Sequence, residues 1–187
     1  MPKYLALVIF LTMVALVIFR VGGLKKIGIK AMRFGELDKT DFIIPPVMLI
    51  YFYHIFAGAF NWPAWGKVMF SSSFTRWIGV CFGSLAVVFM VLSLLAFGRS
   101  FRVGIDWETP DKLVTDSIFA FSRNPIYVGF LFLLLGMFLI FATPLFLGYL
   151  LGGVLLISRQ IKREEEFLIG HYGLEYQNYM AKVKRYI

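Results

Sequence analysis

The sequence predicts an all-α integral membrane protein with about five transmembrane helices. Of its 187 residues, 59% are hydrophobic and only 16% are charged, which is the composition of a membrane protein. Five apolar runs are separated by polar segments. The basic residues, which give a formal charge of +8, lie between these runs. We therefore attribute them to membrane topology and set nucleic-acid binding aside.

The first two apolar runs cover residues 4–19 and 42–60. A cleaved signal peptide is an alternative for the first run, but the basic loop after it contains no convincing small-residue cleavage site, so we expect a retained helix. The second run has His54 in its middle. A histidine at that depth is a functional candidate by default. Because no second ligand or carboxylate lies near it in the sequence, a hydrogen-bonded structural role is favoured.

The third run covers residues 77–97 and follows a segment rich in tryptophan, which is typical of a membrane interface. Gly79 and Gly83 are four residues apart, a spacing that allows another helix to approach closely. Cys81, which is the single cysteine, lies inside this run. One cysteine excludes an internal disulfide and a cysteine-based zinc cluster.

The fourth and fifth runs cover residues 126–142 and 145–158, with Thr143-Pro144 between them. The 14 residues of the fifth run span roughly 21 Å, against about 30 Å of hydrocarbon. This helix must continue past Arg159 or lie in a locally thinned membrane. The small residues of the two runs predict a tight antiparallel hairpin; they are Gly129, Gly136, Gly148 and Gly152.

The distribution of charge predicts the orientation. Residues 20–41, 98–125 and 159–187 hold 16 of the 19 basic residues and all 11 acidic residues. We therefore expect these segments in the cytoplasm, with the N-terminus outside and the C-terminus cytoplasmic. The chain divides into residues 1–97, which form the first three helices, and residues 98–187, which form a core that carries the function.

Two stretches in the second part carry most of the polar information. In the run from Arg123 to Gly129, a polar loop leads directly into an apolar helix. Pro125 suits the first turn of that helix. The free amides of this turn can bind an anionic or polar ligand. Residues 157–172 predict a helix that ends near Gly173, with a further short helix after it. On a helix the glutamates 164–166 point in different directions, about 100° apart.

Taken alone, this tail is also compatible with an amphipathic helix lying on the membrane surface. The combination of motifs favours another interpretation. The run Arg123-Asn124-Pro125-Ile126-Tyr127-Val128-Gly129, an apolar hairpin, Glu164-Glu165 and the segment from Tyr172 to Tyr179 resemble the signature of the isoprenylcysteine carboxyl methyltransferase family, which groups with membrane phospholipid methyltransferases. The family pattern is Arg-His-Pro-x-Tyr-x-Gly, then Glu-Glu and an aromatic-Gly-x-x-Tyr-x-x-Tyr tail. The resemblance covers roughly residues 98–187.

The resemblance implies an S-adenosylmethionine-dependent methyltransferase that acts on a lipidic or small hydrophobic acceptor, with an isoprenylcysteine-like carboxylate as one candidate. Its cofactor pocket would be cytosolic and formed by the loop before the fourth helix, the hairpin and the tail. The implied catalytic residues are Glu165 and an arginine, Arg159 or Arg163, of which we choose Arg159. The implied cofactor-binding residues are Leu113, Val114, Asn124, Pro125, Tyr127, Gly129 and Glu164. No metal is expected.

One residue departs from the family pattern. Asn124 stands where the pattern has histidine. An amide donates and accepts hydrogen bonds but does not change charge near neutral pH. Cofactor binding should therefore survive this change more easily than proton transfer.

Methyl transfer from a sulfonium mainly requires that donor and acceptor be aligned. A carboxylate acceptor is already ionised and needs only a cation such as Arg159, whereas an amine or thiol needs a base, for which Glu165 is the nearest candidate. A phospholipid amine or thiol methyltransferase therefore remains an alternative. A structural or accessory membrane protein remains another. A transporter is less favoured, because no acid, lysine or arginine lies in the middle of a span.

Overall fold

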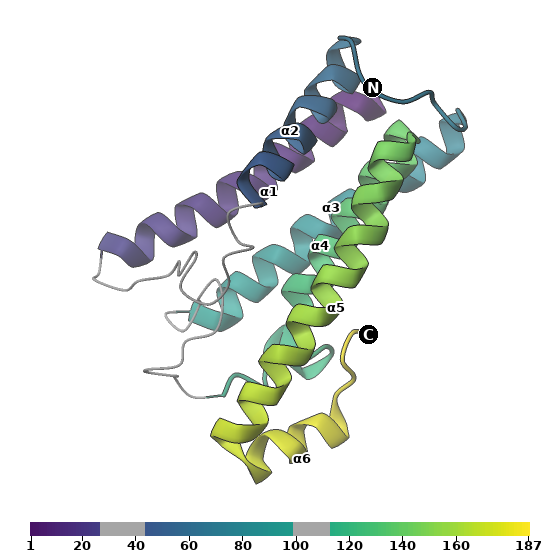
Figure 1. Cartoon of the computed structure of the whole chain (residues 1–187). Coiled ribbons are helices and arrows are strands. Elements are labelled where there is room, and N and C mark those ends of the chain that lie inside the picture. Colours follow the sequence, from purple (N-terminus) through teal and green to yellow (C-terminus); the bar gives the residue numbers. More distant parts are fainter. Residues whose placement is uncertain (27–43, 99–112) are drawn as a thin grey trace.

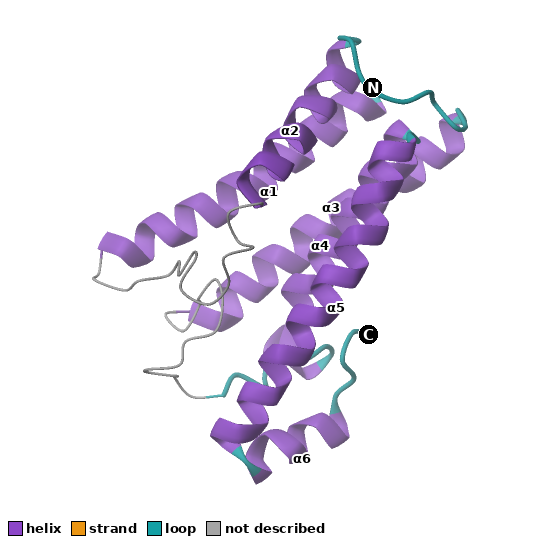
Figure 2. Cartoon of the chain, in the orientation of Figure 1, coloured by secondary structure: helices purple, strands orange, loops and turns teal. Residues whose placement is uncertain are grey.

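The computed structural model describes residues 1–26, 44–98 and 113–187, and these residues form helices and loops, without a strand (Figure 2). In chain order the helices are α1 (Pro2–Lys26), α2 (Ile44–Phe60), α3 (Ser73–Phe97), the short 3-10 helix η3 (Ser117–Ala120), α4 (Pro125–Phe141), α5 (Pro144–Tyr172) and α6 (Leu174–Lys182). The predicted helical class is confirmed. Over the described residues, each of the five expected apolar runs corresponds to one helix, from α1 to α5.

Three of these helices, α1, α3 and α5, are long and apolar enough to cross a membrane. The helices α2 and α4 are also apolar, but each has 17 residues and spans only about 25 Å. As expected, α5 does not stop at Ser158 but continues for a further 14 residues to Tyr172. The chain is therefore an integral membrane protein by its helices, while the five-span topology stays a prediction.

Local sequence signals explain the boundaries of the last helices. Pro125 and Pro144 stand at the first turns of α4 and α5, where a missing N–H costs no hydrogen bond. The hydroxyl of Thr143 accepts a hydrogen bond from the amide of Phe146 and so caps α5. At the other end of α5, Gly173 has a φ of +55°, a backbone conformation that glycine adopts most readily. The predicted end of the long helix is confirmed.

The closest helix pair is α3 with α4, and glycines make it possible. A Cβ atom added at Gly136 would lie 2.7 Å from the carbonyl oxygen of Gly79 and 2.9 Å from the amide nitrogen of Gly83. The expectation that Gly79 and Gly83 admit another helix is confirmed. The predicted glycine contact between α4 and α5 is wrong, because Gly148 and Gly152 have nothing within 4 Å of an added Cβ. The small residues of α4 face α3 instead.

The remaining helices complete a bundle with two distinct ends. The helix α1 contacts α2, α3 and α4, and the core between them includes Phe10, Ile55, Met90 and Met137. Figure 1 shows the start of α1 beside the end of α2 at one end of the molecule. At the other end, α5 extends beyond the bundle, α6 turns back from it, and the chain end returns toward α5. This return brings the C-terminal residues to the beginning of α4.

Candidate active site

A buried carboxylate is the centre of the polar end. Glu165 on α5 is only 4% exposed, while the neighbouring Glu166 is exposed and Glu164 is half-buried. The expectation that the three glutamates point in different directions is confirmed. A buried carboxylate is costly unless cations or hydrogen bonds compensate it, so its partners are informative.

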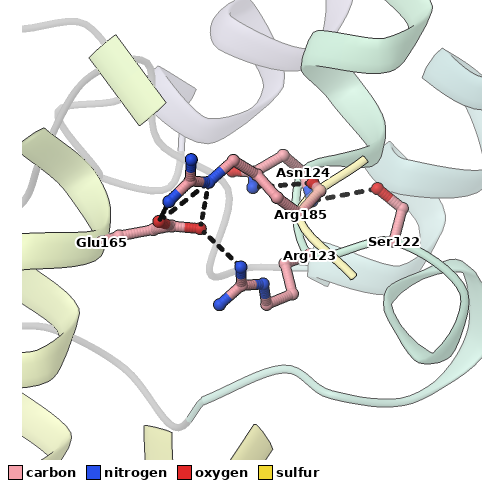
Figure 3. A network of polar contacts seen from close by, with 5 residues as sticks. All are labelled: Ser122, Arg123, Asn124, Glu165 and Arg185. Atoms are coloured by element: carbon pink, nitrogen blue, oxygen red, sulfur yellow. Dashed lines mark hydrogen bonds and ion pairs between the residues drawn. The ribbon is translucent and has the colours of Figure 1, made fainter. Parts of the chain in front are cut away.

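Two arginines from distant parts of the sequence bind this carboxylate (Figure 3). Arg185 binds both oxygens of Glu165, with Nε at 3.2 and 3.1 Å and Nη2 at 2.6 Å. Arg123, in the loop before α4, places Nη2 3.2 Å from Oε1 of the same carboxylate. The side chain of Arg123 is 8% exposed and that of Arg185 is 39% exposed. Glu165 therefore joins α5, the loop before α4 and the C-terminal segment.

Hydrogen bonds to backbone carbonyls hold the C-terminal segment against the same loop. The amide of Arg123 donates to the carbonyl of Lys184 at 3.0 Å, and Nδ2 of Asn124 donates to the carbonyl of Arg185 at 3.0 Å. The amide of Asn124 also donates to Oγ of the buried Ser122 (Figure 3). Asn124 precedes α4 but does not cap it with its side chain. The side-chain amide of Asn124 instead binds the carbonyl of Arg185 and holds the C-terminal segment against this loop.

A second polar cluster is centred on Glu164, the residue before Glu165 on α5. The hydroxyl of Tyr127 on α4 donates to Oε1 of Glu164, and Nε2 of Gln160 donates to the same oxygen at 2.9 Å. The helices α4 and α5 are thus joined by a tyrosine–carboxylate–amide cluster next to the arginine–carboxylate cluster. Because Oε1 takes both bonds, the described side chains leave Oε2 of Glu164 available to a ligand that donates hydrogen bonds.

The cluster of Arg123, Arg185 and Glu165 has an excess of positive charge and hydrogen-bond donors that no described partner uses. Two guanidinium groups face a single carboxylate, and the hydrogen bond to Glu165 raises the pKa of Arg185. Within the described residues, Nε and Nη1 of Arg123 are buried without a hydrogen-bond partner. Buried donors of this kind are uncommon and call for a partner. They fit the carboxylate of an amino-acid-like cofactor, while the second cluster offers acceptors for hydroxyl or ammonium groups.

The short helix α6 supports this end of the molecule. Tyr176 and Tyr179 are its buried residues, and the hydroxyl of Tyr179 donates to the carbonyl of Phe119 in η3 at 2.6 Å. Burial raises the pKa of Tyr179 to about 12, although the charge of Arg123 opposes the shift. Tyr179 therefore remains a neutral donor at physiological pH and holds α6 against the loop that carries Arg123.

The structure assembles most, but not all, of the predicted site residues. Asn124, Tyr127, Glu164 and Glu165 gather around the two clusters. Pro125 is buried at the start of α4, and Leu113 and Val114 are half-buried in the segment before η3. These last three residues make no side-chain hydrogen bond, as expected for apolar side chains.

Two predicted residues lie elsewhere. Arg159 is exposed, and the arginines that pair with Glu165 are Arg123 and Arg185. Because Arg159 is six positions from Glu165 on one helix, its side chain points about 120° away around the axis. Gly129 faces α3, where an added Cβ would lie 3.2 Å from the carbonyl oxygen of Ala86. The demonstrated role of this glycine is therefore helix packing.

Neither arginine that binds Glu165 was predicted as a site residue from the sequence. Arg123 opens the motif before α4, and this position was a usable signal. Arg185 had no comparable signal, because Lys182 and Lys184 lie next to it in the same basic tail. Within the described ranges, no group of three or more His, Cys, Asp or Glu residues is placed to hold a metal ion.

Fold and site together define a helical integral membrane protein with a buried arginine–carboxylate site at one end of its bundle. The family model described as phospholipid methyltransferase matches residues 74–175, which is more than half of the chain. The chain therefore belongs to the phospholipid methyltransferase family. The match includes Arg123, Tyr127, Glu164 and Glu165, whereas Arg185 lies beyond it.

Several relatives carry a more specific name. A probable protein-S-isoprenylcysteine O-methyltransferase of Oryza sativa subsp. indica is 31% identical over 113 residues, which are 59% of each protein. The protein-S-isoprenylcysteine O-methyltransferase of Tribolium castaneum is 29% identical over 57% of this chain and 39% of its own length. That of Xenopus laevis is 31% identical over 57% and 38%. The chain thus spans less than two thirds of the length of these relatives.

Proposed function

We propose that this protein is an S-adenosylmethionine-dependent methyltransferase that transfers a methyl group to a lipidic acceptor carrying a carboxylate, of the isoprenylcysteine type. The observation that carries the proposal is the buried Glu165 between Arg123 and Arg185, beside the Tyr127–Glu164 cluster. Membership of the methyltransferase family and the names of the relatives support the reaction class.

The proposed cofactor supplies an electrophilic methyl group on a sulfonium, which suits the reaction class named by the family. The residues of this chain fit it at two points. Nε and Nη1 of Arg123 are donors for its carboxylate. Glu164, held by Tyr127 and Gln160, is an acceptor for its hydroxyl or ammonium groups.

The pairing of Glu165 with two arginines favours a carboxylate acceptor over an amine. An amine would need a base to remove its proton, but Glu165 already binds two guanidinium groups through both of its oxygens. A carboxylate acceptor needs no base. It needs only a cation for orientation, and Arg185, whose side chain is partly exposed, is the candidate, since Arg123 is assigned to the carboxylate of the cofactor. The protein would then act mainly by placing donor and acceptor in line.

The surroundings suggest how the reactants reach the site. The site lies at the end of the bundle where α5 extends into a polar tail, so the cofactor would enter from water and the lipidic acceptor from between the helices. The excess of basic residues in the flanking segments supports a cytoplasmic position for this end. The active site would then face the cytoplasm.

Calorimetric titration of the detergent-solubilised protein with S-adenosylmethionine and S-adenosylhomocysteine tests the cofactor. We expect saturable binding of both. Glu165→Gln should weaken it by roughly tenfold, because Arg123, the proposed ligand of the cofactor's carboxylate, then loses the charged partner that holds it in place. Glu166→Gln, which changes an exposed neighbour on the same helix, is the matched control. A folded protein that binds neither compound would contradict the proposal.

The acceptor is tested with two compounds that differ in one group. A farnesylated cysteine with a free carboxylate should accept the methyl group, whereas the same compound with a carboxamide should not. Phosphatidylethanolamine serves as the amine acceptor. Methylation of the amine but not of the carboxylate would keep the enzyme class and overturn the acceptor proposed here.

A further inference from the structure

A cavity lies at the end of the bundle opposite Glu165. Its volume is about 300 Å³. It is lined by residues from the start of α1, the end of α2, the loop after α2, the start of α3 and the turn between α4 and α5. No part of the proposed methyl-transfer site contributes to it, so it calls for a separate explanation.

Hydrogen bonds hold the wall of this cavity in place, and His54 is one of the residues that do so. Its Nδ1 bonds the carbonyl of Ile50 at 2.8 Å, and its Nε2 accepts the amide of Trp65 at 3.2 Å. Both ring nitrogens are therefore used, with the proton on Nδ1. The expected structural role of His54 is confirmed.

The loop after α2 is held at two more points. The hydroxyl of Tyr53 donates to the carbonyl of Pro63 at 2.7 Å, and the amide of Met69 donates to the carbonyl of Ala142 at 2.7 Å. Gly66, with a φ of +89°, lies against Pro144 at the start of α5. The cavity is therefore preformed by residues that the backbone holds in position.

The polar lining of the cavity suits an anion. Lys3 and Arg76 both line it, and none of its lining residues is acidic. Among the described residues, the side chain of Lys3 makes one hydrogen bond, to Asn61 at 3.3 Å, and the side chain of Arg76 makes one, to Ser71 at 2.6 Å. An ammonium has three N–H donors and a guanidinium has five, so each cation keeps donors for a ligand.

The apolar surroundings suit a lipid. Trp62 and Trp65 line the cavity, and Phe74 and Trp77 are exposed at the start of α3 beside it. Tryptophan is typical of the level of the lipid headgroups, and exposed aromatic rings there contact acyl chains. In a membrane protein, an anion that reaches a cavity at this level is most simply the phosphate of a lipid.

We propose that this cavity binds the phosphate group of an anionic membrane phospholipid, with Lys3 and Arg76 as the phosphate ligands. The bound lipid is not the methyl acceptor, because Glu165 lies at the opposite end of the bundle. Its role is to hold together the ends of α1, α2 and α3, which meet at the cavity. The proposal does not depend on the methyltransferase activity.

Thermal unfolding of the delipidated protein in detergent tests this proposal. Phosphatidylglycerol should raise Tm by about 2–4 °C, since a ligand that binds only the folded state stabilises it. Diacylglycerol with the same chains tests the need for phosphate, and glycerol phosphate without chains tests for a phosphate from solution. Neither should reproduce the shift.

Matched variants locate the effect. Lys3→Gln and Arg76→Gln should each remove most of the Tm shift, measured from the lipid-free Tm of the same variant. Lys67→Gln should keep it, because Lys67 is an exposed cation of the same loop that does not line the cavity. Equal stabilisation by diacylglycerol, an equal effect of glycerol phosphate, or a shift that persists in both Lys3→Gln and Arg76→Gln would each overturn the proposal.

Discussion

Arg185 binds the carboxylate of Glu165 with two of its nitrogens, Nε and Nη2, across 20 residues of sequence. This two-point geometry is the strong form of an arginine–carboxylate pair. Because Asn124 also binds the carbonyl of Arg185, the C-terminal segment is attached to both α5 and the loop before α4. The segment after α6 therefore belongs to the proposed active site.

The geometry of Arg185 predicts a graded response to substitution. Arg185→Gln removes the charge and both contacts, and should weaken S-adenosylhomocysteine binding by roughly tenfold or more. Arg185→Lys keeps the charge but lacks the planar guanidinium that binds at two points, so its loss of S-adenosylhomocysteine affinity should be intermediate. Calorimetry measures both. Lys184→Gln is the control, because the described contact of Lys184 uses its backbone carbonyl. If this control lost as much affinity, the tail would act only through its charge.

Tyr127 should act through Glu164. In Tyr127→Phe the carboxylate keeps its bond to Gln160 but loses the one that ties it to α4. We expect methyl-donor affinity to fall by about tenfold, which is the effect of one hydrogen bond to a charged group. Helical content, measured by circular dichroism, should not change. Tyr53→Phe removes a comparable hydroxyl at the opposite end of the bundle and should leave affinity unaltered.

Two glycine substitutions should have opposite effects on stability. Gly136→Ala places a methyl group 2.7 Å from the carbonyl oxygen of Gly79, so α3 and α4 must separate, at a cost of about 1–3 kcal/mol. Gly148→Ala meets nothing within 4 Å and should stabilise α5 by up to about 1 kcal/mol. Thermal unfolding in detergent compares the two. Equal Tm values would contradict the tight contact between α3 and α4.

Tyr179 should make stability depend on alkaline pH. Its pKa is raised from 10.0 to about 12 in the folded protein, so the folded state keeps a proton that the unfolded state loses in this range. Its contribution is therefore complete below pH 10 and is lost as the pH rises toward 12. Tyr179→Phe should lower stability at neutral pH, because the Phe119 carbonyl loses its donor. The variant should also lose less stability than the native protein between pH 10 and 12.

Much of the architecture could be predicted from the chain alone, because local signals determine helices. The apolar runs correspond to α1 to α5. The prolines at the starts of α4 and α5 and Gly173 after α5 explain the bounds of these helices. Helix partners were less predictable. Gly136 and Gly148 look alike in the sequence, yet one lies against the backbone of α3 and the other lies in open space. Glycine spacing permits a close contact but does not specify the partner.

The candidate site, too, could be predicted only in part from the sequence. The motif before α4 and the paired glutamates predicted that Tyr127, Glu164 and Glu165 would serve one site, and the structure brings them together. The predicted catalytic arginine, Arg159, is exposed, and the arginines that pair with Glu165 are Arg123 and Arg185. Proximity along a helix is a poor guide at six residues, because the side chains then point to different faces.

The sequence by itself determined the helical membrane class, the positions of the helices and the residues of the motif, since these depend on hydropathy and on signals within a few residues. Only the tertiary structure decided which cations meet Glu165, that α4 packs its glycines against α3, and that a basic cavity lies at the opposite end. These features depend on contacts between residues far apart in the chain. A buried carboxylate requires a cation, but the path of the chain determines which cation reaches it.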